Sequence, residues 1–171
     1  KLAGVPSLTF PENQKVTIYW DGRAENSVDP ISGKKDFEGY RLYRTNAGFD
    51  LTDNIDNLGS LVKLAEFDSI GNNIGYDTGF PEFIKLEEPI TFPNDTVVYK
   101  YKFEIENLLN GWQYLFAVTA FDSGDPVNNL ESLESSQLAG MKRILPGTLP
   151  TSEEGKEIGV YPNPYYGSAY W

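Results

Sequence analysis

The chain has 171 residues and a formal net charge of −11 at pH 7, and it contains neither cysteine nor histidine. This length suits one domain with appendages. The missing residue types exclude disulfides, thiolate nucleophiles, Ser-His-Asp triads and the commonest zinc ligand. The acidic balance argues against nucleic-acid partners and anionic membrane surfaces, and no apolar run approaches the roughly 20 residues that span a bilayer.

The first half of the chain alternates between short strand-like segments and polar connections. After a linker at residues 1–7, apolar and polar residues alternate in a way that predicts half-buried strands. The strands predicted here cover residues 7–10, 15–20, 37–45 and 61–67. The second of them ends in Trp20, and the third places Tyr40 and Leu42 on one face.

Residues 68–96 form a long irregular connection that is rich in glycine and proline. Connections of more than about 12–15 residues usually carry function or small extra elements. The apolar runs at residues 83–86 and 90–92 predict an additional hairpin within it. Residues 97–105 then show the cleanest alternation in the chain, with Tyr99, Tyr101, Phe103 and Ile105 on one face.

The segment 108–122 predicts the centre of the fold, because its period of two carries apolar residues on both faces. Ahead of this strand, Leu108, Gly111 and Tyr114 follow one another at intervals of three. A leucine in the core, a glycine in the turn and a tyrosine hydroxyl that bonds back to the backbone make up a tyrosine corner. We therefore predict such a corner here.

The last part of the chain predicts one more strand at residues 135–145, a polar linker at 146–159, and a new apolar stretch at 160–171. We expect that stretch to be the first strand of a following, incomplete domain. No helical period of useful length occurs in the chain. Six or seven short strands separated by turn residues predict an all-β sandwich.

The order of these signals resembles a fibronectin type III domain. Three short patterns follow that family's order over residues 8–145. They are Trp20 at the end of a strand, the run Gly39 to Arg44, and the pattern from Leu108 through Gly111 and Tyr114 to Ala120. The resemblance implies an immunoglobulin-like Greek-key sandwich with Trp20 and Tyr40 in its core. The chain departs from the family in its long loop insertions, at residues 46–60 and 68–96.

A second resemblance covers only the tail. Residues 160–165, which read VYPNPY, look like the opening of the C-terminal sorting domains that bacteria of the Bacteroidota type use for type IX secretion. This resemblance implies a multidomain protein that is secreted or held at the bacterial cell surface.

Two acidic loops are candidate cation ligands. Asp21 and Asp29 follow the second predicted strand, whereas Asp122 and Asp125 follow the central strand. In a sandwich of this type both loops emerge at the same pole, and calcium takes six to eight oxygen ligands from such side chains. The competing interpretation is that Asp, Asn and Gly are there because they form turns. No other cofactor is expected.

Two sets of apolar residues are candidate interaction sites. Leu115 and Phe121 lie on the outer face of the central strand, and we expect the 68–96 insertion to cover them through Phe83, Ile84 or Phe92. The tail carries Val160, Tyr161, Tyr165 and Trp171 with almost no charge, so it should pack on a following domain, another copy of the chain or this sandwich.

The sequence therefore favours a non-catalytic structural or adhesion module of an extracellular or cell-surface bacterial protein, whose partners are neighbouring domains or other copies of itself. One alternative is a carbohydrate-binding module beside a secreted enzyme, with Tyr19, Tyr43 and Trp112 stacking on glycan rings. Another is a subunit of an extracellular filament, joined through its apolar tail. We expect no enzymatic activity and no membrane insertion.

Overall fold

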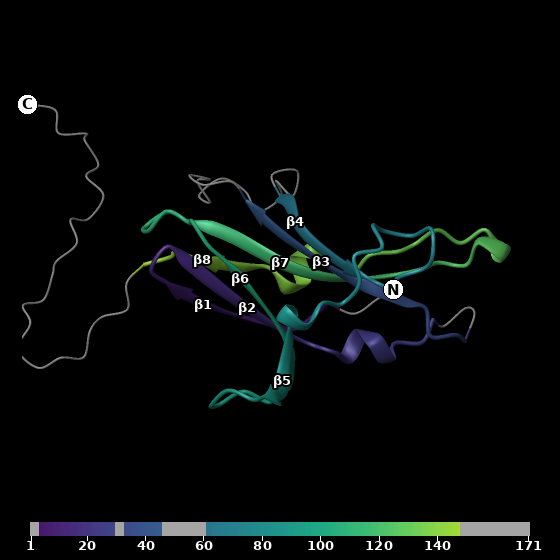
Figure 1. Ribbon diagram of the computed structural model, residues 1–171, viewed down its shortest axis with the longest axis horizontal. Helices are drawn as coiled ribbons and strands as arrows, with labels where there is room; N and C mark the ends of the chain where they lie inside the picture. The colour runs from purple at the N-terminus through teal and green to yellow at the C-terminus, as the bar shows by residue number, and fades with distance from the viewer. Residues whose placement is uncertain (1–3, 30–32, 46–60, 148–171) are drawn as a thin grey trace, which may run out of the picture.

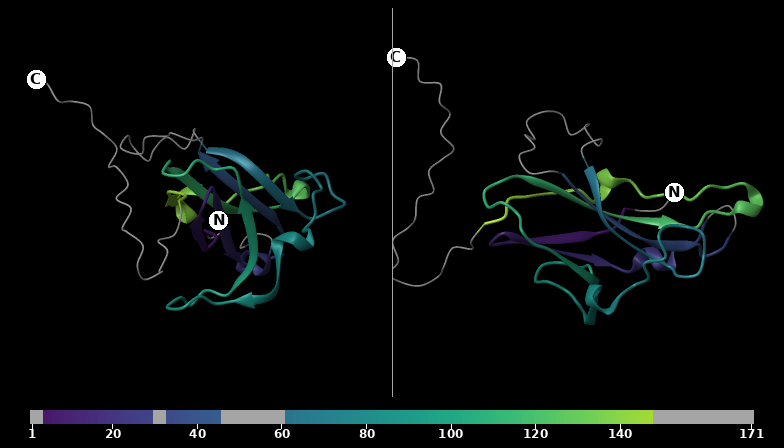
Figure 2. Two further views of the ribbon diagram at one scale, coloured as in Figure 1. Left: turned by 60° about the vertical axis from the view of Figure 1, so that its left-hand side comes forward. Right: turned by 45° about the horizontal axis from the view of Figure 1, so that its top comes forward.

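The computed structural model describes residues 4–29, 33–45 and 61–147, which form two antiparallel four-stranded sheets packed face to face (Figures 1 and 2). Sheet A contains, in spatial order, β1 (Ser7–Glu12), β2 (Lys15–Asp21), β6 (Tyr99–Ile105) and β5 (Lys85–Ile90). Sheet B contains β4 (Leu61–Asp68), β3 (Phe37–Thr45), β7 (Tyr114–Asp122) and β8 (Lys142–Ile144). The prediction of an all-β sandwich is confirmed.

Helical structure in the described residues is limited to 3₁₀ turns of three or four residues. These are η1 (Arg23–Asn26), η3 (Glu82–Ile84), η4 (Pro126–Asn128) and η5 (Gln137–Gly140). Within the same residues, no helix has the length and apolar character needed to cross a membrane.

The β1–β2 hairpin shows how local sequence produces the strands. Glu12 pairs with Lys15 across a two-residue turn, in which Gln14 has a positive φ of 55°. Pro11 lies inside β1, opposite Val16, although the strand predicted from the sequence ended at residue 10. A proline is compatible with this position because β1 is an edge strand, where an N–H that faces solvent can be missing.

β7 lies between β3 and β8, and all nine of its residues are buried. The predicted tyrosine corner stands at its start. The backbone N–H of Leu109 donates to the hydroxyl of Tyr114 at 3.0 Å, and the Leu108 side chain is buried in the core. Gly111 turns the chain between them with a φ of 74°, which favours glycine.

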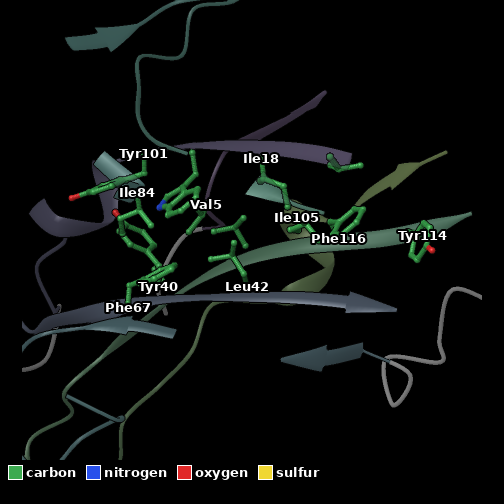
Figure 3. Close-up of a cluster of buried hydrophobic side chains, with 14 of the residues drawn as sticks. Val5, Ile18, Tyr40, Leu42, Phe67, Ile84, Tyr101, Ile105, Tyr114 and Phe116 are labelled. Atoms are coloured by element: carbon green, nitrogen blue, oxygen red, sulfur yellow. The ribbon is translucent and has the colours of Figure 1, made fainter. Parts of the chain in front are cut away.

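The core between the sheets is built from aromatic rings of both layers (Figure 3). The indole of Trp20 stacks on Tyr101 of the same sheet at 5.5 Å and meets Tyr40 of sheet B edge-on at 5.9 Å. The expected core residues Trp20, Tyr40, Leu42, Tyr114, Phe116 and Val118 are all buried. Phe103 packs against this cluster but stays partly exposed, because it lies at an open side of the sandwich.

Two predicted elements differ from the structure. The apolar runs of the 68–96 insertion do not form a separate hairpin: Ile84 enters the core and β5 joins sheet A next to β6. The predicted last strand at 135–145 is divided into η5 and the three-residue β8. Both differences arise because a pattern of apolar residues indicates burial without naming the neighbour against which a segment packs.

The first prediction tests how much the hydroxyl of Tyr114, the tyrosine of the corner, contributes to stability. We expect Tyr114→Phe to reduce the free energy of unfolding by about 1 kcal/mol, because the Leu109 N–H loses its acceptor. In thermal denaturation this corresponds to a fall of about 2–4 °C in Tm. Tyr76→Phe is the matched control, since the Tyr76 side chain is mostly exposed and its hydroxyl can bond to water. Equal melting temperatures for the two variants would show that the corner contributes nothing to stability.

Candidate functional site

The two acidic loops meet at one pole of the sandwich, as predicted. The backbone N–H of Ser123, in the loop after β7, donates to the carbonyl of Asp36, in the loop before β3. The ammonium of Lys34 lies 4.0 Å from the carboxylate of Asp125 and links the same two loops. We call the described residues that meet here, 22–29, 33–36 and 122–134, the acidic pole.

The charged form of one carboxyl group in the acidic pole, that of Asp36, is disfavoured by its surroundings. Burial raises the pKa of the half-buried Asp36, and the nearby carboxylates of Asp122 and Asp29 raise it further. Like charges at short range oppose each other's ionisation. The fold therefore places three acids close enough to interact at this pole.

The carboxylates of Asp122 and Asp125 serve as hydrogen-bond acceptors for their own loop. Asp122 accepts backbone N–H groups of Gly124 and Leu133, at 3.1 and 2.7 Å. Asp125 accepts the N–H of Val127, the backbone N–H of Asn128 and an N–H of the Asn128 side-chain amide. These bonds are typical of aspartates that stabilise turns.

The four aspartates proposed as metal ligands are only partly brought together. Asp29, Asp122 and Asp125 belong to the acidic pole, whereas the buried Asp21 pairs with Arg23 of η1. Nowhere in residues 4–29, 33–45 and 61–147 do three acidic side chains form a set that could hold a metal ion. In the described structure the aspartates of the loop after β7 therefore act in turns.

A charged network that the sequence did not predict covers the outer face of sheet B. Arg41 of β3 donates to Glu66 of β4 and to Glu134 of the loop after β7, both at 2.7 Å. Lys63 donates to the same oxygen of Glu66 at 2.6 Å. The sequence around Glu134 gave no sign that this residue would lie here, because Glu134 and Arg41 are 93 residues apart in the chain.

Glu134 connects this network to β7. Its carboxylate accepts the hydroxyls of Thr119, at 2.6 Å, and Tyr43, at 2.8 Å. Burial and the hydrogen bond to Glu134 raise the pKa of Tyr43 to about 12, so the phenol stays protonated as a donor. A β-bridge between Glu134 and Phe121 fixes the backbone in place.

Leu115 and Phe121 are buried within the chain itself, at 8% and 0% exposed. The guanidinium of Arg41 lies 3.8 Å from the centre of the Phe121 ring. The ring also approaches Gly39, where an added Cβ would come within 2.9 Å of its Cε1 atom and 2.3 Å of the Phe67 carbonyl oxygen. Only glycine therefore fits at this position of β3.

The expected cover for these residues was wrong. Residues 85–92 of the insertion lie on sheet A, where Phe92 packs against Phe10 and Tyr19, whereas residues 69–78 bond to Glu38 and Glu66 of sheet B. The segment after β7 pairs along the edge of that strand instead, and the side chains of Glu134 and Arg41 reach over its outer face. The tail residues Val160, Tyr161, Tyr165 and Trp171 lie outside the described residues.

The three aromatic residues considered for glycan stacking do not form one row. Tyr43 is buried on the outer face of sheet B, whereas Tyr19 is half-buried in the aromatic cluster of sheet A. Trp112, which is 48% exposed, lies in the loop between β6 and β7. A flat strip for a sugar chain is therefore not formed by these side chains.

Comparisons with known proteins give little further information. No family model matches the chain, and no curated protein matches it. Among solved structures, the chain is similar to Astrotactin-2, described as a conserved vertebrate-specific and perforin-like membrane protein involved in neuronal development. The TM-score is 0.46 and the identity 13%, over 87% of this chain and 23% of that one. The chain thus spans about a quarter of that protein's length.

The raised pKa of Asp36 gives a prediction about pH. A carboxyl whose pKa is higher in the folded state than in the unfolded state stabilises the fold only at low pH, and this contribution is lost as the pH rises through the folded pKa. We therefore expect Asp36→Asn to raise Tm at pH 7 by about 1–2 °C, with the difference disappearing below about pH 3.5. Asp125→Ala, which removes an acceptor of turn hydrogen bonds, should lower Tm instead. A pH-independent difference for Asp36→Asn would contradict this account.

The Glu134 network can be tested by removing its carboxylate. We expect Glu134→Ala to reduce the free energy of unfolding by about 2 kcal/mol, because Thr119, Tyr43 and Arg41 each lose a hydrogen-bond partner. Glu131→Ala removes the same charge from an exposed position of the same loop and should leave stability within about 0.5 kcal/mol. Chemical denaturation of both variants measures the difference, and equal values would mean that net charge alone is responsible.

Proposed function

We propose that this chain is a non-catalytic structural or adhesion module, similar to a fibronectin type III domain, in an extracellular or cell-surface bacterial protein. The observation that carries the proposal is the path of the chain through the sandwich, which enters at one pole and leaves at the other. The strand order and the sequence of the tail add to it.

The path follows from contacts between the first and last described segments. At one pole, Val5 and Ser7 lie against Gly140, whose carbonyl accepts the Ser7 hydroxyl. At the other pole, the N–H of Gly147 donates to the carbonyl of Glu12, at the end of β1. The two segments therefore run side by side in the same direction, along the sides of sheets A and B that carry β1 and β8 (Figure 1).

Such a path suits a module that is linked in series with others. Neighbouring domains would attach at opposite poles, so the sandwich adds length to a multidomain chain and transmits force between its ends. The strands at the two ends lie parallel to the direction of pull, so unfolding must shear β1 from β2 and β8 from β7.

The strand order supports the comparison with the immunoglobulin-like group. Sheet A has the spatial order of strands A, B, E and D of that fold, and β3, β7 and β8 correspond to strands C, F and G. The tyrosine corner at Tyr114 lies at the start of the strand that corresponds to F. On this assignment β4 is an added edge strand next to β3.

The bacterial cell-surface location rests on the resemblance of residues 160–165 to a type IX sorting motif. The absence of cysteine and histidine from the chain, and the use of the acidic pole for turns, fit a module that contributes mechanical structure.

Single-molecule pulling tests the proposed mechanical role. Force applied through the two ends of the full chain should give one cooperative unfolding peak, with a contour-length gain of about 3.6 Å for each of the 144 residues from 4 to 147, less the folded end-to-end distance. Pulling through exposed sites on β4 and β5, which peels edge strands, should require less force. Extension of the sandwich without a resolvable peak would contradict the proposal.

A further inference from the structure

A small hollow lies beside η1, just after the end of β2 (Figure 1). It has a volume of about 180 Å³ and is lined by residues 4–6 together with Asp21, Arg23, Ala24 and Ser27. An apolar cavity of about 150 Å³ is large enough to hold benzene, so this hollow has room for an organic group of about six heavy atoms. We call it the η1 hollow.

Asp21, which lines the η1 hollow, has a carboxylate oxygen without a hydrogen-bond donor. The Asp21 side chain is only 3% exposed, and its Oδ2 accepts the Nε–H of Arg23. The other oxygen, Oδ1, is buried and receives no hydrogen bond within the described chain. A buried acceptor without a partner costs free energy, so a donor that enters the hollow and reaches Oδ1 is bound favourably.

Ser27 adds a second acceptor to the lining of the η1 hollow. Its hydroxyl donates to the carbonyl of Ala24 at 2.7 Å, and a serine hydroxyl has only one proton to donate. The Ser27 oxygen can therefore take part in a further hydrogen bond only as an acceptor. Arg23 is 68% exposed and directs its Nε–H to Asp21. The buried polar groups of the hollow thus favour a ligand that donates hydrogen bonds.

The other walls of the hollow favour an organic cation over a metal ion. Val5, Pro6 and Ala24 supply apolar surface, and Val5 belongs to the core. Calcium takes six to eight oxygen ligands, and no three acidic side chains of the described residues gather into a metal site. An alkylammonium ion matches this lining, because its head carries three N–H donors and no acceptor while its stem is apolar.

The walls of the hollow are fixed by contacts of their own. η1 is tied to sheet A by Glu25, whose carboxylate accepts the hydroxyl of Tyr101 at 2.7 Å and the ammonium of Lys100 at 2.6 Å. The backbone carbonyl of Asp21 accepts the hydroxyl of Tyr40 at 3.2 Å. A site whose walls are already in place spends little binding energy on ordering them, so even a small ligand binds measurably.

We propose that the η1 hollow binds a primary alkylammonium group of the size of a lysine side chain. The ammonium donates hydrogen bonds to Asp21 Oδ1 and Ser27 Oγ, and the stem packs against Val5, Pro6 and Ala24. The group belongs either to a lysine of a partner polypeptide or to a free amine, and the last experiment below separates these two sources. The proposal is independent of the function proposed above.

An NMR titration of the full chain with n-butylammonium at pH 7 tests the proposal. We expect saturable shifts of the amide signals of Val5, Gly22 and Ala24, with a Kd on the order of 1–10 mM because so few heavy atoms supply limited binding energy. n-Butanol and n-butyrate have similar stems and should bind at least about tenfold more weakly, since neither brings a positive charge to the carboxylate. Equal binding of the three probes, or no saturable shift with n-butylammonium, would overturn the proposal.

Two variants place the ligand in the hollow. Asp21→Asn keeps the shape of the side chain but removes its charge, and it should weaken binding of n-butylammonium at least about tenfold. Ala24→Leu leaves the carboxylate intact and fills the hollow, so it should abolish binding even if Asp21→Asn does not fold. Glu87→Gln, on the exposed side of β5, removes the same charge elsewhere and should leave the Kd within about twofold. Unchanged binding in folded Ala24→Leu would overturn the proposal.

A third titration identifies the source of the ammonium group. Nα-acetyl-lysine methylamide carries the same four-carbon stem and ammonium as n-butylammonium, but on a peptide backbone. A Kd within about threefold of that of n-butylammonium would assign the hollow to a lysine side chain of a partner polypeptide. Binding of n-butylammonium alone would support the proposal with a free amine as the ligand, because the backbone then prevents the stem from entering. Binding of neither probe would overturn the proposal for both sources.

Discussion

β7 has to be covered on both faces, and most other features of the structure depend on that requirement. All nine residues of the strand are buried, yet a two-layer sandwich covers only one face of each sheet. The inner face meets the aromatic rings of sheet A. The outer face is covered by side chains, because the loop after β7 returns along the edge of the strand and places the Glu134 carboxylate over Thr119.

That cover is polar, although the face beneath it is apolar. Arg41 resolves the conflict, because its guanidinium carbon lies 3.8 Å from the centre of the Phe121 ring while its N–H groups bind Glu66 and Glu134. A planar cation can stack on an aromatic ring and still donate hydrogen bonds at its edge. The charges of the outer face are thus used to keep water from an apolar strand, and the face becomes part of the interior.

The two sides of the sandwich differ in how well they are closed. On one side β1 and β8 lie together and the bond from Gly147 to Glu12 ties the last described segment to the first hairpin. On the other side the insertion supplies β5, which pairs with only half of β6. Phe103 belongs to the regular core-facing series of β6 but is left partly exposed, because no strand of the described residues lies beside this part of β6.

The sequence alone determined most of the strands, their faces and the corner. A side-chain period of two is a local property of extended backbone, so β3 was predicted with its observed bounds, and the spacing of Leu108, Gly111 and Tyr114 was enough to predict the bond at the start of β7. Only the tertiary structure decided which segments lie beside one another. The period of two predicts that the Phe121 side chain packs against other residues. It does not identify Arg41 and Glu134, which come from other segments of the chain, as the residues that cover it. For the same reason the sequence predicted a packing role for Phe83, Ile84 or Phe92 without showing that Ile84 would enter the core and that β5 would join sheet A. Apolar surfaces attract one another without direction, so only the sheet order selects the partner.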